Sequence, residues 1–115
     1  MYIEILGTKY KLEYRNLEDN KELDEMDGYT DNYKKIIVIG NLEQRDYFKN
    51  ELKGKINIVK NKVLRHEIIH AFLFESGLDT NSNRSDSWAD NEEMVDWLAI
   101  QSPKIFKVYK NLDIL

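Results

Sequence analysis

The segment of the chain with the clearest chemical meaning is His66-Glu67-Ile68-Ile69-His70. Two histidines four residues apart lie on the same face of an α-helix, so their ring nitrogens can bind one metal ion. Zn²⁺ suits imidazole ligands in this arrangement, and Glu67 would lie beside the ion, where a carboxylate can accept a proton from a zinc-bound water. The segment therefore predicts a zinc site in which Glu67 is the general base.

A third protein ligand must come from elsewhere, because catalytic zinc sites commonly hold three protein ligands and a water. Glu92 and Asp96 are four residues apart and share one face of a second expected helix. This spacing favours Glu92 as the third ligand and Asp96 as the acceptor that fixes the tautomer of a ligand histidine. Glu93 is the alternative ligand, but Asp90 and Glu93 have the spacing of a helix capping box. Attraction to the helix dipole would explain Glu92 and Glu93 without any metal, but it leaves Asp96 unexplained.

The N-terminal third of the chain has the alternation typical of strands. Residues 2–6 carry alternating or clustered apolar side chains, Gly7 and Thr8 indicate a turn, and apolar side chains then alternate at Tyr10, Leu12 and Tyr14, which predicts a hairpin. Residues 35–39 are rich in β-branched side chains and predict a third strand in the same sheet. The polar segment 16–31 is open between a short amphipathic helix and an ordered loop. We therefore expect a small, mostly antiparallel sheet of about three strands.

Helices make up most of the rest. Apolar residues lie almost all round the helix predicted over 61–76, so it should be buried, and Gly77 suits a left-handed helix end. After a polar loop over 79–87, residues 88–100 predict a second helix. Ser102 and Pro103 are typical of the N-cap and first position of a last short helix. The expected fold class is α+β, with the sheet packed on an active-site helix and a glutamate helix.

Composition limits the classes of function. The chain has 115 residues, of which 42% are hydrophobic, and this predicts one domain over residues 1–115. Because it has no cysteine, a metal must be held by nitrogen and oxygen, and we expect a cytoplasmic location. A net charge of -4 argues against a nucleic-acid partner. No segment has the apolar length of a membrane span or the pattern of a signal peptide, so we expect no membrane partner.

The order His66-Glu67-Ile68-Ile69-His70 and then Glu92-x-x-x-Asp96 resembles the gluzincin pattern of thermolysin-like metallopeptidases. The chain is short, and its expected strands precede one active-site helix and one glutamate helix. In this arrangement it resembles the minigluzincins and the phage-associated metallopeptidases of the ImmA/IrrE and SprT-like kinds. The resemblance covers about residues 61–100. It implies a zincin-like metallopeptidase that hydrolyses a peptide or protein substrate. It also implies zinc ligation by His66, His70 and Glu92, with Glu67 as general base and acid and Asp96 supporting a ligand.

The chain departs from thermolysin because it has no third histidine to stabilise the oxyanion beside the scissile carbon. Another donor is required, and the candidates are Tyr29, Tyr33, Tyr47, Arg84 and Tyr109. The strand predicted over 35–39 could bind an extended substrate if it forms the edge of the sheet, with Asn41 contacting the substrate backbone.

The alternative function is that of a latent or non-catalytic zinc-binding module with a regulatory or interaction role. In that case residues 111–115 would shield the site, and Asp113 or the terminal carboxylate would take the open position on the zinc.

Overall fold

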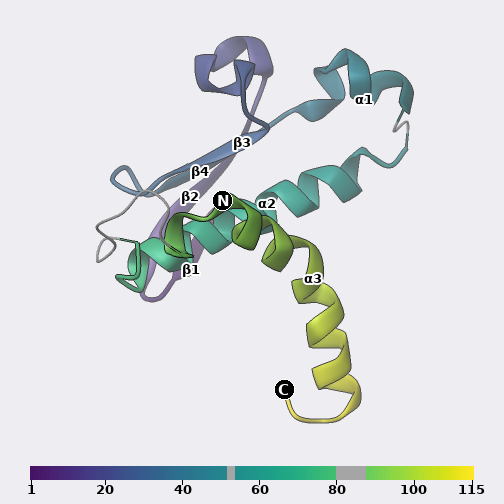
Figure 1. Cartoon of the computed structure of the whole chain (residues 1–115). Helices are drawn as coiled ribbons and strands as arrows, with labels where there is room; N and C mark the ends of the chain where they lie inside the picture. Colours follow the sequence, from purple (N-terminus) through teal and green to yellow (C-terminus); the bar gives the residue numbers. More distant parts are fainter. Residues whose placement is uncertain (52–53, 80–87) are drawn as a thin grey trace.

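The fold combines a four-stranded sheet with two long helices (Figure 1). The structure is a computed structural model, which describes residues 1–51, 54–79 and 88–115, and the side chains of all of these except 49–51. Short 3₁₀ turns occupy Leu17–Asp19, Lys21–Asp24, Leu42–Gln44 and Trp88–Asp90. The strands and α-helices are β1 Tyr2–Ile5, β2 Thr8–Arg15, β3 Gly28–Asp31, β4 Ile36–Gly40, α1 Asp46–Glu51, α2 Ile56–Glu75 and α3 Glu92–Asn111.

The sheet consists of two antiparallel hairpins joined by one parallel pairing. Its strand order is β1-β2-β4-β3, with β2 and β4 parallel and the other two pairs antiparallel. The first hairpin turns through Leu6 and Gly7, which both have positive φ, as a type I′ turn requires. The α+β class, this hairpin and the strand over 35–39 in the same sheet are confirmed.

The number of strands expected from the sequence is wrong, because β3 forms within the segment 16–31. Its four residues, Gly28-Tyr29-Thr30-Asp31, do not alternate in polarity, and Gly28 and Asp31 at its two ends are poor strand formers, so it becomes a strand by pairing with β4. As a result β4 is a central strand, and its Ile37, Val38 and Ile39 are fully buried. The prediction of β4 as a substrate-binding edge is therefore wrong, and β3 is the edge strand on this side.

Helix α2 lies across the sheet and carries the candidate metal-binding segment His66–His70. Val63, Glu67 and Ala71 follow one face at intervals of four residues, and all three are buried. The helix begins earlier than expected, at Ile56, and ends as predicted before Gly77, whose φ is 86°. It is not buried all round, because Ile58 and Phe72 on other faces are 68% and 41% exposed.

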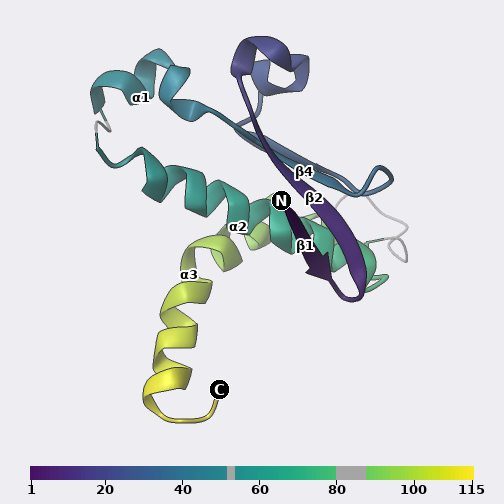
Figure 2. The same cartoon turned by 180° about the vertical axis from the view of Figure 1, so that it is seen from behind.

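Helix α3 runs through the position where the sequence predicted a new helix. Asn91 is its N-cap and accepts a hydrogen bond from the Met94 N–H at 2.8 Å, so the capping box expected from Asp90 is wrong. The helix continues past Pro103, so the separate last helix is also wrong. In both views α3 changes direction along its length, and its second half points away from the sheet (Figure 1; Figure 2).

A side chain from α2 explains how α3 tolerates this proline. Pro103 has no N–H, so it leaves the carbonyl of Ala99, four residues earlier, without its helical donor. The Nε–H of Arg65 donates to that oxygen at 2.6 Å. Arg65 precedes His66, so the contact also joins the two long helices beside the candidate metal-binding segment. No helix in the described part of the chain is long and apolar enough to span a membrane.

Candidate metal centre

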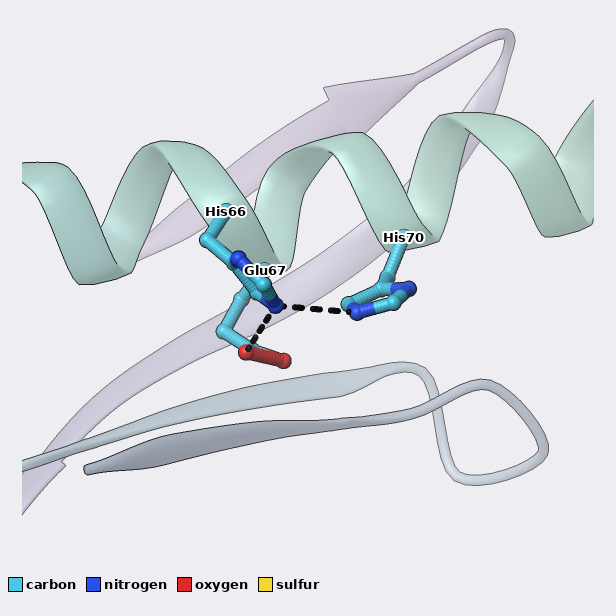
Figure 3. A group of neighbouring side chains, drawn as sticks. All are labelled: His66, Glu67 and His70. Atoms are coloured by element: carbon cyan, nitrogen blue, oxygen red, sulfur yellow. Dashed lines mark hydrogen bonds and ion pairs between the residues drawn. The ribbon is translucent and has the colours of Figure 1, made fainter. Parts of the chain in front are cut away.

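Three side chains of α2 gather on the side that faces the β3–β4 hairpin. Figure 3 shows His66, Glu67 and His70 extending from the helix in this direction. The Nε2 atoms of His66 and His70 lie 3.1 Å apart, and Glu67 Oε2 lies 4.0 Å from His66 Nε2. The ligand atoms of all three residues fall within 4.8 Å of one another, so this group could hold a metal ion.

Glu92 reaches the same point from the first turn of α3, just after the Asn91 cap. One of its carboxylate oxygens lies 2.9 Å from His66 Nε2, and the other lies 3.1 Å from His70 Nε2. Ligand atoms that share a tetrahedral zinc at about 2.0–2.1 Å are separated by roughly 3.3 Å. The two imidazoles and the Glu92 carboxylate are therefore spaced as ligands of one zinc ion would be.

Asp96 and Lys62 complete the polar surroundings of His66. Asp96 Oδ1 lies 3.3 Å from His66 Nδ1 and 2.6 Å from Lys62 Nζ. The hydrogen bond from Lys62 is the main cause that lowers the pKa of Asp96, so this carboxylate is ionised. An ionised Asp96 favours the proton of His66 on Nδ1, which leaves a lone pair on Nε2 facing a carboxylate oxygen of Glu92. Two acceptors this close repel each other unless a cation or a proton lies between them.

Glu67 is buried, and its carboxylate is hydrogen-bonded by a side chain of the sheet. Glu67 is only 6% exposed. Thr30 Oγ1, on β3, lies 3.1 Å from Glu67 Oε1 and 3.0 Å from the Glu67 carbonyl oxygen. Burial raises the pKa of the Glu67 carboxyl, while the charge of His70 and the bond from Thr30 act in the opposite direction. A raised carboxyl pKa suits a group that takes and returns a proton near neutral pH.

These residues line a cleft of about 550 Å³ between β3, α2 and the start of α3. Asp79 and Asp90 also line it. Their carboxyl groups share a hydrogen bond, which is the main cause that raises the pKa of Asp79, and partial burial adds to it. The sequence predicted neither Thr30 nor this pair. Thr30 lies in a segment without a strand pattern, and Asp79 falls in the predicted polar loop 79–87, of which residues 80–87 lie outside the described part.

The other residues named from the sequence fall in different places. Glu93 is exposed and does not line the cleft, whereas Glu92 does. Tyr29 lines the cleft, but its hydroxyl bonds Asn20 Oδ1 at 3.0 Å and Arg15 at 3.1 Å. The other described candidates for an oxyanion donor, Tyr33, Tyr47 and Tyr109, do not line it, and Arg84 lies outside the described residues.

The proposed tail shield is likewise not found at the cleft. None of residues 111–115 lines the described cleft, and all five are exposed.

Comparison of the chain with known protein families, with curated proteins and with solved structures found no match.

Proposed function

We propose that the chain is a zinc-dependent peptidase of the gluzincin type, a single zincin-like domain over residues 1–115 that hydrolyses peptide bonds in a peptide or protein substrate. The observation that supports this most directly is the convergence of three possible ligands beside a buried carboxylate. His66 Nε2, His70 Nε2 and the Glu92 carboxylate lie within 3.3 Å of one another, and Glu67 lies next to them in an open cleft.

The residues divide the reaction between them. A zinc ion held by His66, His70 and Glu92 would supply a Lewis acid and lower the pKa of a bound water. Glu67 accepts the proton of the attacking water and later donates it to the leaving amine. Asp96 holds the ring of His66 in one tautomer and orientation, which keeps Nε2 available as a ligand.

The edge strand β3 offers a surface for an extended substrate. Gly40 N–H donates to the Asp27 carbonyl at 2.9 Å, so Asp27 and Gly40 form a hydrogen-bonded pair at the end of the β3–β4 ladder. Hydrogen-bonded and non-bonded pairs alternate along antiparallel strands, so Tyr29 bonds β4, whereas Gly28 and Thr30 direct their backbone N–H and C=O groups to the outer edge. Both residues line the cleft, where a peptide could pair with them.

The second candidate function is a zinc-binding module without catalytic turnover, with a regulatory or interaction role. The position of the tyrosines favours it, because no described tyrosine presents a free hydroxyl to the cleft as an oxyanion donor. Efficient peptide hydrolysis needs such a donor to stabilise the negative charge of the oxyanion, or the metal alone would have to stabilise it. For either function we propose a cytoplasmic location and no nucleic-acid partner.

Glu67→Gln separates the two functions, because the amide keeps the shape of the side chain but cannot act as a base. The unmodified chain, Glu67→Gln and the matched control Glu93→Gln are loaded with zinc and incubated with a denatured protein mixture. New peptide termini are identified by mass spectrometry. A peptidase should produce termini with the unmodified and Glu93→Gln chains and none with Glu67→Gln, at equal zinc content. Equal cleavage by Glu67→Gln would refute the mechanism, and no cleavage by any chain would favour the module.

A further inference from the structure

Thr30 connects the edge strand to the side chain that would act as the base. Its hydroxyl has one proton and faces two acceptors, the Glu67 carboxylate and the Glu67 carbonyl oxygen, at 3.1 and 3.0 Å. A carboxylate is the stronger acceptor, and the carbonyl already serves the helix, so the proton belongs to Oε1. This bond holds Oε1 on the β3 side and leaves Oε2 facing the ligand nitrogens, 4.0 Å from His66 Nε2.

The close approach of β3 to α2 is what allows a side chain as short as threonine to reach Glu67. At Gly28, two residues before Thr30, a Cβ atom would lie 2.9 Å from both Val63 Cγ1 and the Val38 carbonyl oxygen. Only glycine fits there without displacing the helix or the neighbouring strand. Gly28 and Thr30 are on the same face of the strand, so the residue that permits the contact and the residue that makes it act together.

We propose that Thr30 is a positioning residue that fixes the orientation of the Glu67 carboxylate and links it to the strand on which the substrate pairs. This inference rests on the proposed peptidase function. The backbone N–H and C=O groups of Thr30 face the outer edge of the sheet, while its hydroxyl holds Glu67 Oε1. The same residue would therefore fix the position of a peptide paired with β3 relative to the Glu67 carboxylate. Thr30 makes no contact with the reacting atoms in this role.

Thr30→Val keeps the volume and strand propensity but removes the donor, and Thr30→Ser keeps the donor. Thr8→Val is the matched control, because Thr8 also donates to a carboxylate, that of Glu75, away from the cleft. We expect Thr30→Val to lower kcat on a peptide substrate about tenfold, the value of roughly one hydrogen bond, with KM within about twofold. Thr30→Ser and Thr8→Val should stay within about threefold of the unmodified chain, and zinc content should be the same in all four.

A second measurement does not need turnover. In chains labelled with ¹³C at the glutamate carboxyl and held at one pH, the Glu67 resonance, assigned by its loss in Glu67→Gln, should move in Thr30→Val and stay in place in Thr8→Val. An unmoved Glu67 resonance, or an unchanged kcat in a cleaving Thr30→Val chain, overturns the role of Thr30. An unmodified chain that cleaves nothing overturns the proposed peptidase, and the resonance then decides the Thr30–Glu67 link by itself.

Discussion

Two carboxylates at the candidate centre differ sharply in exposure. Glu67 is the only acidic residue among those described that is buried, whereas the side chain of Glu92 is 69% exposed. An exposed carboxylate gains little from ordinary ion pairing, because water screens the charge. A divalent cation shared with His66 and His70 would give Glu92 a reason to be held at 2.9–3.3 Å from both rings.

The choice between the two neighbouring glutamates can be tested directly. Glu92→Ala should reduce bound zinc well below one equivalent after dialysis, because two imidazoles alone hold the ion weakly. Glu93→Ala should leave the zinc content near that of the unmodified chain, and His66→Ala and His70→Ala should lose the metal as Glu92→Ala does. Metal content by mass spectrometry provides the measurement. Loss of zinc from Glu93→Ala with retention in Glu92→Ala would show that the ligand is the other glutamate.

The sequence predicts the residues of this centre that repeat at intervals of four along a helix, and it misses Thr30, which reaches the centre from a strand. The interval of four residues in a helix is enough to place His66 beside His70, and to put Glu92 and Asp96 on the face of a second helix that meets His66. Thr30 has no such regularity, since its contact with Glu67 depends on how closely a strand from another part of the chain packs on α2. The roles of His66, His70 and Glu92 as ligands, and of Glu67 as the base, stay predictions.

Among the elements, α3 shows how a neighbour overrides a local signal. Ser102 and Pro103 are a good helix start, but the start is used only if the preceding helix has ended. It does not end, because Arg65 supplies the hydrogen bond to the Ala99 carbonyl that Pro103 removes. The same dependence on a neighbour explains why the local sequence does not predict β3, since this segment becomes a strand by pairing with β4.

The replacement of a backbone donor by Arg65 predicts a coupled effect on stability. Arg65→Met should destabilise the chain by about 1–3 kcal/mol, because the Ala99 carbonyl loses its donor. In a Pro103→Ala background the N–H of residue 103 can bond that carbonyl, so Arg65→Met should cost about 1 kcal/mol less. Urea unfolding of the four chains at one zinc concentration measures the cycle. Strictly additive effects would mean that Arg65 acts without regard to the proline.

The C-terminal end of α2 is anchored to the sheet through Glu75. Thr8, Tyr10 and Lys35 donate to its carboxylate at 3.1, 2.7 and 2.5 Å. The hydrogen bond from Lys35 is the largest cause that lowers the pKa of Glu75, and those from Tyr10 and Thr8 add to it. The ionised carboxylate is therefore bound more strongly in the folded chain than in the unfolded one.

This anchor should make stability depend on pH in the acid range. The contribution of Glu75 is fully present above the ordinary carboxyl pKa of 4.5 and is lost as the pH falls through the lowered value of the folded state. Glu75→Gln should lower the free energy of unfolding by roughly 1 kcal/mol at neutral pH, and its stability should fall less steeply below pH 4.5. Urea unfolding from pH 3 to 7 tests this, with Glu93→Gln as an exposed control. Parallel curves for Glu75→Gln and the unmodified chain would contradict it.

For the molecule as a whole, the candidate ligands come from two helices, so zinc would join α2 to α3. An ion that binds only the folded chain stabilises it by mass action, by about 4 kcal/mol when its concentration is a thousand times Kd. At this chain length that amounts to a rise in Tm of roughly 10 °C or more. Thermal melts followed by circular dichroism, with zinc and with EDTA, measure the difference. His70→Ala should melt at the same temperature under both conditions, and an unmodified chain that did so too would argue against a shared ion.

The joining of two hairpins by a parallel pair also has a consequence for how the chain is made. Each hairpin can close locally within microseconds. The parallel partner of β2, strand β4, is synthesised only after the whole segment 16–35. During that interval the edge of β2 that will meet β4 is open, and open edges invite pairing between chains. Charged side chains at Lys11, Glu13 and Arg15, joined by ion pairs of 2.8 and 2.6 Å, occupy one face of β2. A nascent chain therefore presents a charged strand, and aggregation of stalled translation products should increase when these three positions are replaced by threonine.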